Sequence, residues 1–266
     1  MTIDRVMPPR GGKPGERGFL VGRVALVTGG ARRIGRALAV ALAEQGADLV
    51  IHYRESSAEA EETTQTIREL GGQVALVSGD LAEVSVAQGL VGTAGVAMGR
   101  PVDILINNAS VFTQGTATAT SPDEWNLNQA VNLRAPFLLS QALAGQLPDD
   151  RSGDIINLND YRALDPGADH FAYTISKVGL HGLTLSLAKA LAPNIRVNEL
   201  ALGAVLPPEK ASDHYVHTLR SQILTGRFPE VAEVVQAMLF MLGNTAVTGQ
   251  TLCVDGGRHL GAGGQE

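Results

Sequence analysis

The chain has 266 residues, of which 44% are hydrophobic and 18% are charged, a composition typical of a globular protein and not of a disordered one. The net charge of −6 at pH 7 speaks against nucleic acid as a partner, because neutralising phosphates requires a basic surface. Cys253 is the one cysteine in the sequence, which excludes an internal disulfide and fits a reducing compartment.

Residues 1–20 are rich in glycine, proline and arginine and contain no apolar core. We therefore expect a flexible segment there, and a second one at residues 261–266. The N-terminal segment lacks the apolar stretch of a signal peptide, and no window reaches the ~18 apolar residues that span a bilayer. The sequence predicts a cytoplasmic protein with no membrane partner.

Short apolar runs alternate with helical patterns over residues 21–260, which we predict to form one domain. The predicted strands are Val24–Thr28, Asp48–His52, Val74–Ser78, Ile104–Asn107, Ile155–Leu158, Ile195–Glu199 and Thr251–Val254. The predicted helices are Ile34–Gln45, Ser57–Leu70, Val84–Ala97, Asn128–Ala144, Ala172–Leu191 and Glu230–Leu242. Apolar strands separated by helices are typical of a parallel sheet covered on both faces. We predict an α/β fold of the Rossmann type, a doubly wound parallel sheet of about seven strands flanked by helices.

The segment Val205–Phe228 breaks this alternation. It carries two prolines, Pro207 and Pro208, followed by a short helical pattern. We interpret it as a loop and helix that cover the site, as lids often do.

The first predicted strand runs into Thr28-Gly29-Gly30-Ala31-Arg32-Arg33-Ile34-Gly35, which opens the first predicted helix. Glycine lets the backbone turn tightly and approach a pyrophosphate, which the helix N-terminus then stabilises. A tight turn without a ligand is the alternative for such a cluster. Its place before an amphipathic helix favours a dinucleotide site, whose predicted residues here are Gly29, Arg32, Arg33, Ile34 and Gly35.

The second predicted strand leads into His52-Tyr53-Arg54-Glu55-Ser56. An NAD site usually has a carboxylate at the end of this strand, where it binds the ribose hydroxyls. Here the strand ends without one, and His52, Arg54 and Ser56 can meet a 2′-phosphate, for which arginine is well suited. Tyr53 is predicted with them as a cofactor-binding residue. Glu55 fits poorly, and both it and Arg54 could be solvated surface charges. The sequence favours NADPH/NADP as cofactor and predicts no metal.

Tyr173 and Lys177 are four residues apart and share one face of a predicted helix. A tyrosine with an ordinary pKa of ~10 is a poor acid–base catalyst near neutrality, and we expect the neighbouring ammonium to lower that pKa. Such pairs are frequent by chance on helix surfaces. Here the pair accompanies the phosphate turn, Asn107-Asn108-Ala109 after the fourth strand, and Asn132 on the next helix. Together these residues indicate an acid–base centre.

These motifs resemble the short-chain dehydrogenase/reductase family over about residues 22–260. The turn resembles the family's Thr-Gly-x-x-x-Gly-x-Gly, with Arg33 in place of a glycine. Asn107–Ser110 resembles its Asn-Asn-Ala-Gly, with Ser110 in place of the glycine, and Asp255-Gly256-Gly257 resembles its C-terminal signature. The resemblance implies a homo-oligomer, commonly a homotetramer, with a homodimer as the alternative.

The family resemblance also implies roles for single residues. Asp80 and Leu81 would contact the adenine, Asn132 would help to hold a proton-relay water, and Lys177 would hold the nicotinamide ribose. The residues that it adds to the cofactor site are Asp80, Leu81, Asn108, Ala109, Ser110, Tyr173 and Lys177.

Asp160 departs from the family pattern, which usually has a serine thirteen residues before the catalytic tyrosine. No serine or threonine occurs between residues 153 and 171, so a small shift of register cannot supply one. An ordinary loop carboxylate is the alternative. A carboxylate beside the active tyrosine, however, must share or relay a proton to avoid a buried unpaired charge.

Arg33, Ser110, Phe112 and Asp160 together resemble the pteridine reductase branch, including its dihydrofolate- and dihydromonapterin-reducing members. In that branch the residue matching Phe112 stacks a flat pterin against the nicotinamide; packing of a lid is the alternative. His170, three residues before Tyr173, could line the pocket, but we interpret it as a surface imidazole. The residues implied for the substrate are Arg33, Ser110, Phe112, Asp160, Tyr173 and Gly203.

Reducing the C=N bond of a pterin requires a hydride at carbon and a proton at nitrogen, which Tyr173 and Asp160 could supply as a coupled pair. The sequence thus predicts NADPH-dependent reduction of a dihydropterin or dihydrofolate to the tetrahydro form. One alternative is a carbonyl reductase of the 3-oxoacyl or quinone type, against which the missing serine counts. Another is a non-catalytic NADP(H)-binding scaffold protein, which would not need Tyr173, Lys177 and Asn132.

Overall fold

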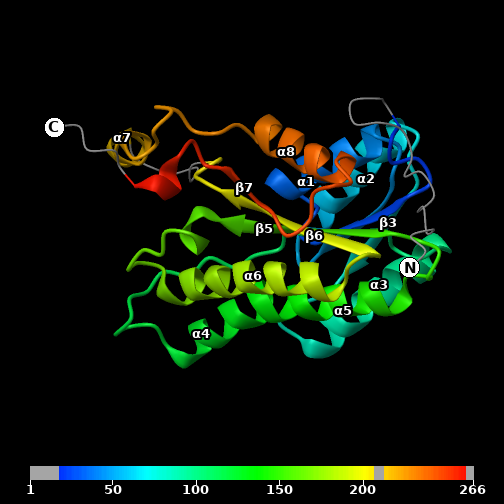
Figure 1. Cartoon of the computed structure of the whole chain (residues 1–266), viewed down its shortest axis with the longest axis horizontal. Coiled ribbons are helices and arrows are strands. Elements are labelled where there is room, and N and C mark those ends of the chain that lie inside the picture. Colours follow the sequence, from blue (N-terminus) through cyan, green and yellow to red (C-terminus); the bar gives the residue numbers. More distant parts are fainter. Residues whose placement is uncertain (1–17, 207–212, 262–266) are drawn as a thin grey trace, which may run out of the picture.

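Seven short apolar runs form the strands of one parallel sheet in the computed structural model (Figure 1). The structure describes residues 18–206 and 213–261, so most of the predicted N-terminal flexible segment, the C-terminal tail, Pro207 and Pro208 lie outside the described residues. The strands are β1 (Val24–Val27), β2 (Asp48–Tyr53), β3 (Val74–Ser78), β4 (Ile104–Asn107), β5 (Gly153–Asp160), β6 (Ile195–Leu202) and β7 (Thr251–Val254). The predicted fold class is confirmed.

The order of the strands is β3-β2-β1-β4-β5-β6-β7, with every neighbouring pair parallel. The direction of winding reverses between β1 and β4. In open α/β sheets ligands bind beyond the carboxyl ends of the strands at such a reversal. The topology therefore directs attention to the ends of β1, β2, β4 and β5.

Helices cover both faces of the sheet (Figure 1). One face carries α1 (Arg33–Glu44), α2 (Ser57–Glu69) and α8 (Val231–Gly243), and the other carries α3 (Val84–Met98), α4 (Pro122–Gln129), α5 (Ala135–Gln146) and α6 (Phe171–Ala190). Each face has its own apolar core: Leu38, Leu42 and Met238 lie in one, and Leu90, Leu139 and Leu187 in the other. Burial of strands on both faces explains why they are apolar without alternation.

The predicted helix over 128–144 is wrong at its start and in its continuity. The structure begins α4 at Pro122, behind a capping box in which Ser121 Oγ accepts from the Glu124 N–H and the Glu124 carboxylate accepts from the Ser121 N–H. Between α4 and α5 the chain forms a π turn, η1 (Ala130–Arg134), which contains Asn132. Such turns are frequent at functional sites because they re-aim side chains.

The fifth and sixth strands extend beyond their predicted ends. Asp160 is the last residue of β5 and pairs in register with Leu202 of β6. Asp160 is thus held on the rigid sheet and not in a loop. That position fixes the direction of its carboxylate relative to α6.

The segment Val205–Phe228 contains the predicted helix, α7 (Asp213–Ser221). Behind α7 the chain returns to the sheet, where the Thr225 N–H donates to Gly256 O just after β7 and Ile223 is buried. Across residues 18–206 and 213–261, no helix has both the length and the apolar character needed to cross a membrane.

Gly35→Ala should destabilise the protein, because a Cβ there would lie 2.2 Å from Gly29 O and 2.6 Å from Asn108 Nδ2. We expect the free energy of unfolding to fall by about 1–3 kcal/mol. Gly89→Ala in α3 is the matched control: it is exposed, its Cβ would meet nothing within 4 Å, and it should gain about 0.5–1 kcal/mol. Denaturant unfolding measures both. A Gly35→Ala protein as stable as the wild type would contradict the close approach of α1 to the turn.

Candidate active site

The phosphate turn between β1 and α1 is tied to the end of β4 by buried hydrogen bonds. Thr28 Oγ1 accepts from the N–H groups of Asn108 and Ala109, and Asn108 Nδ2 donates to the carbonyls of Thr28 and Gly29. Gly29 adopts a left-handed conformation, with φ of 61°. These contacts pre-form the turn, so no side chain has to be reordered for its backbone to receive a ligand.

Two arginines stand at the N-terminus of α1. Arg32 caps the helix and Arg33 begins it, and the first turn contains no acidic residue. Arg33 has φ of 53°, a left-handed conformation that costs a residue other than glycine about 1 kcal/mol. Two cations at the positive end of a helix dipole are repelled by the dipole and by each other, and a bound anion would relieve this repulsion. The donors at this turn fit a pyrophosphate.

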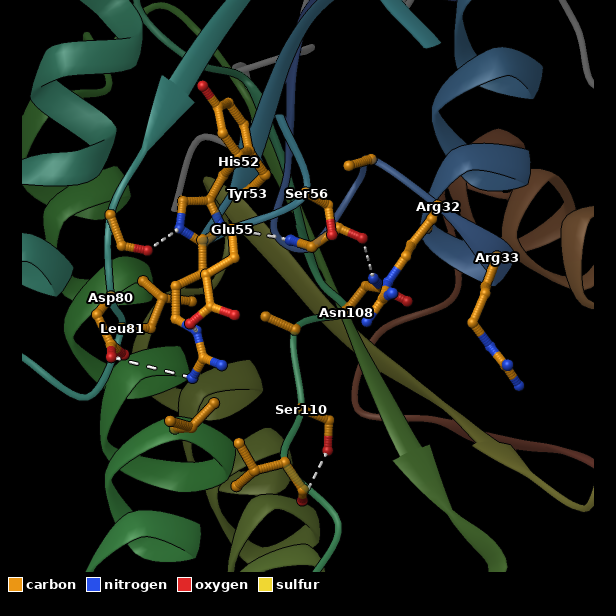
Figure 2. Close-up of a pocket in the computed structure, with 18 of the residues that line it drawn as sticks. Arg32, Arg33, His52, Tyr53, Glu55, Ser56, Asp80, Leu81, Asn108 and Ser110 are labelled. Carbon is orange, nitrogen blue, oxygen red and sulfur yellow. Dashed lines mark hydrogen bonds and ion pairs between the residues drawn. The ribbon is translucent and has the colours of Figure 1, made fainter. Parts of the chain in front are cut away.

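A cavity of about 390 Å³ opens in front of the turn (Figure 2). In Figure 2 the Arg32 and Arg33 side chains extend on one side of it, and Asp80 and Leu81 lie on the opposite side. The cavity is lined by fourteen of the predicted cofactor residues: Gly29, Arg32, Arg33, Ile34, Gly35, His52, Tyr53, Arg54, Ser56, Asp80, Leu81, Asn108, Ala109 and Ser110. Their assignment to a cofactor stays a prediction, but they share one cavity.

Five further residues line the cavity without having been assigned to it: Ala31, Glu55, Gly79, Val111 and Val131. Ala31 and Glu55 are neighbours of predicted residues, and Gly79 precedes Asp80. Val131 comes from the π turn η1. A single sequence contains no pattern that predicts a π turn, so Val131 could not have been predicted to line the cavity.

His52 holds the turn together from within. Its ring is buried, its Nδ1 accepts from the Gly29 N–H at 3.3 Å, and its Nε2–H donates to Gly79 O at 3.1 Å. Burial lowers the pKa of the imidazole, which keeps it neutral. Since both ring nitrogens are used by backbone groups, His52 organises the walls of the cavity and offers no ring nitrogen to a phosphate.

Arg54 is the cation at the end of β2 that can reach an anion. Its side chain is 48% exposed and forms ion pairs with Glu55 at 3.1 Å and, more loosely, with Asp80 at 4.0 Å. Exposed pairs of this kind contribute little to stability. A ligand phosphate can therefore compete for the guanidinium.

Tyr173 and Asp160 form a direct hydrogen bond, in which the Tyr173 hydroxyl donates to Asp160 Oδ2 at 2.8 Å. The Arg162 N–H donates to the second carboxylate oxygen at 2.9 Å and fixes its orientation. Burial, and then the charge of Asp160, raise the pKa of Tyr173 well above 10. The expectation that a neighbouring ammonium lowers this pKa is therefore wrong. In this structure Tyr173 is a neutral phenol poised to give up a proton only to a strong acceptor.

Lys177 is buried one turn further along α6. Its Nζ donates to Leu158 O at 2.8 Å and lies 5.6 Å from the centre of the Tyr173 ring. Burial lowers the pKa of the ammonium to about 8, against the charges of Asp160 and Glu199, which raise it. Lys177 thus loses its charge much closer to neutrality than an exposed lysine does.

Asn132 fastens the β4 loop to α6 through its whole amide. Its Oδ1 accepts from Ser110 Oγ and the Val111 N–H, and its Nδ2 donates to Val111 O and to Ser176 Oγ. These bonds set the positions of Ser110 and its neighbours at the cavity. A role in holding a relay water stays a prediction.

Phe112 lies beside the Tyr173–Asp160 pair with 59% of its surface exposed. Its ring stacks on His170 with centroids 4.0 Å apart, and meets Tyr173 edge to face at 4.6 Å. His170 is the residue before α6, with φ of 49°, and its Nδ1 contacts Thr113 O at 2.8 Å. The interpretation of His170 as a surface imidazole is wrong. No pattern in the sequence reveals a left-handed histidine at a helix start.

Gly203 follows Leu202, the register partner of Asp160, and lies one strand away from it. A Cβ at Gly203 would come within 2.8 Å of Asp255 Cα, so the glycine allows the two chain segments to approach. Like Phe112, Asp160, Tyr173 and Lys177, it is not among the residues that line the described cavity. Phe112 directly follows Val111, which lines the cavity, and it contacts Tyr173, which in turn donates to Asp160.

Comparisons with known proteins agree with this geometry. The family model described as short chain dehydrogenase matches residues 23–214. The BbsD subunit of (2S)-[(R)-hydroxy(phenyl)methyl]succinyl-CoA dehydrogenase from Thauera aromatica is 34% identical over 91% of this chain and 98% of its own. The 3-oxoacyl-[acyl-carrier-protein] reductase FabG of Staphylococcus aureus is 30% identical over 89% of this chain and 98% of its own. The crystal structure of FolM alternative dihydrofolate reductase 1 from Brucella canis, complexed with NADP, superposes with a TM-score of 0.88 at 35% identity, covering 94% of this chain and 99% of that one.

The buried Lys177 should make the free energy of unfolding depend on pH. Because its pKa falls from 10.5 to about 8 on folding, the folded chain holds fewer protons, and the cost of burying the ammonium is full below pH 8 and vanishes toward pH 10.5. Lys177→Met should therefore gain up to about 3 kcal/mol over the wild type below pH 8 and lose this gain as the pH rises. Denaturant unfolding of both proteins measures the difference. A difference that does not vary with pH would contradict the burial of a charged lysine.

Proposed function

Because this chain belongs to the short-chain dehydrogenase family, we propose that it is an oxidoreductase that uses NADPH to reduce a dihydropterin or dihydrofolate to the tetrahydro form. The observation that carries the proposal is the hydrogen bond from Tyr173 to the Asp160 carboxylate. The resemblance to the pteridine reductase branch, and the similarity to a protein described as an alternative dihydrofolate reductase, support it.

Electrostatics favour a ring nitrogen over a carbonyl oxygen as the group that is protonated. A carbonyl oxygen becomes negative during reduction and needs neutral or positive donors around it. A carboxylate at the position of Asp160 would repel that charge in a dry site. A ring nitrogen that gains a proton is instead stabilised by an adjacent carboxylate.

The cofactor proposal rests on the donors around the cavity. Arg32 and Arg33 would bind the pyrophosphate at the N-terminus of α1, and Arg54 and Ser56 would bind the 2′-phosphate. Lys177 would hold the nicotinamide ribose. When bound, NADPH supplies the hydride that the reaction consumes. The Brucella canis FolM structure contains NADP, which is consistent with this assignment.

The substrate proposal rests on Phe112 and the polar groups near it. One face of the Phe112 ring is taken by His170, and 59% of the residue is exposed, so the ring can receive a flat heterocycle. Ser110 and Arg33 would bind the polar edges of a pterin. Asp160 would accept a hydrogen bond from a ring N–H or an amino group of the pterin.

The proton of the reaction comes from the Tyr173–Asp160 pair. The substrate nitrogen takes one proton as the neighbouring carbon receives the hydride, so the C=N bond becomes a C–N bond with one hydrogen added at each end. Tyr173 is a phenol in the structure and so holds the proton that this direction needs. Asp160, which is partly exposed, would return a proton from solvent to the pair.

Carbonyl reduction is the second candidate function, and the similarity to FabG favours it. The 30% identity to FabG covers most of the chain, but Asp160 stands where that reading needs an uncharged donor. A scaffold protein that binds NADP(H) without turnover is a third reading. That reading gives no reason for the hydrogen bond between Tyr173 and Asp160 or for the burial of Lys177.

We also propose that the protein is cytoplasmic and assembles as a homotetramer, or as a homodimer. Large apolar side chains are exposed on two adjacent helices, with Phe137 on α5 and Val178 and Leu185 on α6 each between 36% and 41% exposed. Exposed apolar groups on neighbouring helices are suited to a subunit interface.

The first test is turnover. Purified protein should oxidise NADPH in the presence of dihydrobiopterin, dihydromonapterin or dihydrofolate, and Asp160→Asn, which removes only the charge, should reduce that rate by about 10²–10⁴-fold. Asp160→Ser should lose pterin reduction as well. Absence of NADPH oxidation with all three substrates would exclude the proposal, and faster reduction of 3-oxoacyl thioesters by Asp160→Ser would favour the carbonyl reading.

The second test is cofactor preference. Arg54→Ala should weaken NADPH binding by about 10- to 100-fold, because a charge-assisted bond to the 2′-phosphate is lost, and should leave NADH binding nearly unchanged. Glu55→Gln is the matched control, which frees Arg54 from its ion pair and should tighten NADPH binding. Fluorescence titration measures the affinities of the wild type and of both variants for NADPH and for NADH. An equal loss for NADPH and NADH would show that Arg54 does not select the phosphate.

A further inference from the structure

Glu199 is a carboxylate in the middle of the sheet to which the proposed reaction assigns no step. It lies on β6, is fully buried, and is flanked in sequence by apolar residues and an asparagine. Burying a charge is costly unless it is paired and hydrogen-bonded. An apolar residue of similar size would fill the same space at less cost, so a carboxylate here calls for a specific reason.

The surroundings of Glu199 are built to hold it as a carboxylate. Its Oε1 accepts from Thr251 Oγ1 at 2.7 Å and contacts His181 Nδ1 at 2.5 Å. Its Oε2 accepts from Asn159 Nδ2 at 2.9 Å and lies 3.1 Å from Thr184 Oγ1. Partners from β5, α6 and β7 thus converge on one side chain, and neither oxygen is left without a donor.

The same network reaches the active-site lysine. Asn159 Nδ2 donates both to Glu199 Oε2 and to the carbonyl of Lys177, and Asn159 immediately precedes Asp160. His181 lies four residues after Lys177 on α6, on the same face of the helix. One amide therefore links Glu199 to the turn of α6 that carries Lys177.

We propose that Glu199 is a positioning residue that keeps the Lys177 ammonium charged in the active site, through its own charge and through the Asn159 link. Two carboxylates act on the charge of Lys177, Asp160 and Glu199, and Asn159 connects Glu199 to the backbone carbonyl of Lys177. The proposal depends on the proposed function only for the use that the reaction makes of the charge on Lys177.

The electrostatics agree with this geometry. Burial alone would drive the lysine toward its neutral form, and the charges of Asp160 and Glu199 oppose that, leaving its pKa at about 8. Among the described residues, His181 on α6 is the titratable side chain that contacts Glu199, and the charge of Glu199 acts on Lys177 and on Cys253 of β7. Asp160 on β5 also acts on Lys177, and the Tyr173 ring lies 5.6 Å from its ammonium. The Cys253 thiol has its pKa raised to about 11 by burial and so is neutral across the range of interest.

The charge of Lys177 can be observed directly, because the sequence has four lysines: Lys13, Lys177, Lys189 and Lys210. Protein labelled with ¹³C at lysine Cε gives four NMR signals whose shifts follow protonation, and Lys177→Met identifies the one of interest. No substrate or cofactor is needed. In the wild type this signal should titrate at about pH 8.

Glu199→Gln should lower the titration midpoint of Lys177 by about half a pH unit or more, since one nearby negative charge is lost. Glu199→Asp keeps the charge but withdraws it by one methylene, so it should give a smaller shift in the same direction and serves if Glu199→Gln does not fold. Thr251→Val is the matched control: it removes one hydrogen bond to Glu199 but no charge, and should leave the midpoint in place. A Lys177 midpoint that is equal in the wild type and in both Glu199 variants would overturn the proposal.

A pH profile of NADPH oxidation separates this inference from the proposed function. With an active pterin substrate, Glu199→Gln should move the alkaline limb of kcat/KM to lower pH by the same amount as the NMR midpoint. If no pterin is reduced and the NMR shift is still seen, the substrate proposal fails and the role of Glu199 stands. If pterins are reduced and neither the NMR midpoint nor the alkaline limb moves, the role of Glu199 fails alone.

Discussion

The hydrogen bond between the Tyr173 hydroxyl and the Asp160 carboxylate joins the last residue of β5 to the first turn of α6. It places a negative charge beside the Tyr173 hydroxyl, at a position where the family pattern usually has an uncharged serine. A carboxylate that is partly withdrawn from water requires compensation. The Arg162 N–H and the Tyr173 hydroxyl donate to Asp160, and the charges of Asp160 and Lys177 attract each other.

The sheet supplies the rigidity that this bond needs. Asp160 belongs to an eight-residue strand paired along its length with β6, so the carboxylate cannot swing away as it could in a loop. The cofactor cavity is formed one strand further on, by turns whose walls are tied together through Thr28, His52 and Asn108. The two halves of the site meet at Ser110, which lines the cavity and whose hydroxyl is held by Asn132. The Tyr173–Asp160 pair and one wall of the cavity are thus positioned by β5 and β4, which are adjacent strands of one sheet.

Much of this could be predicted from the sequence, because spacing and local pattern determine it. Apolar runs located all seven strands, and the four-residue spacing of Tyr173 and Lys177 placed them on one face of α6. Features that depend on tertiary structure could not be predicted. The direction of the Tyr173 pKa shift follows from burial, which the sequence does not report, and Val131 reaches the cavity only through a π turn.

Two of the missed features did leave a signal. Ser121 and Glu124 are spaced as a capping box before Pro122, which is the pattern of a helix start. Glu199 lies with Arg196 and Asn198 in a strand whose other residues are apolar, and charged residues at such positions indicate a buried polar network. His170 left none, since its stacking on Phe112 depends on a left-handed backbone conformation at the start of α6.

The effect of two carboxylates on the charge of Lys177 also bears on how substrate specificity can change. The family pattern would be restored by a serine at position 160, which removes the charge that opposes a carbonyl substrate. The same replacement removes one of the two carboxylates that keep Lys177 protonated, and a lysine with a pKa of about 8 has little margin before it loses its charge near neutrality. The serine would then lie in a site whose lysine has a lower pKa and is less often charged. On the proposed function, a change from ring-nitrogen to carbonyl chemistry therefore requires a second adjustment around Lys177, since the charges of both carboxylates act on its ammonium.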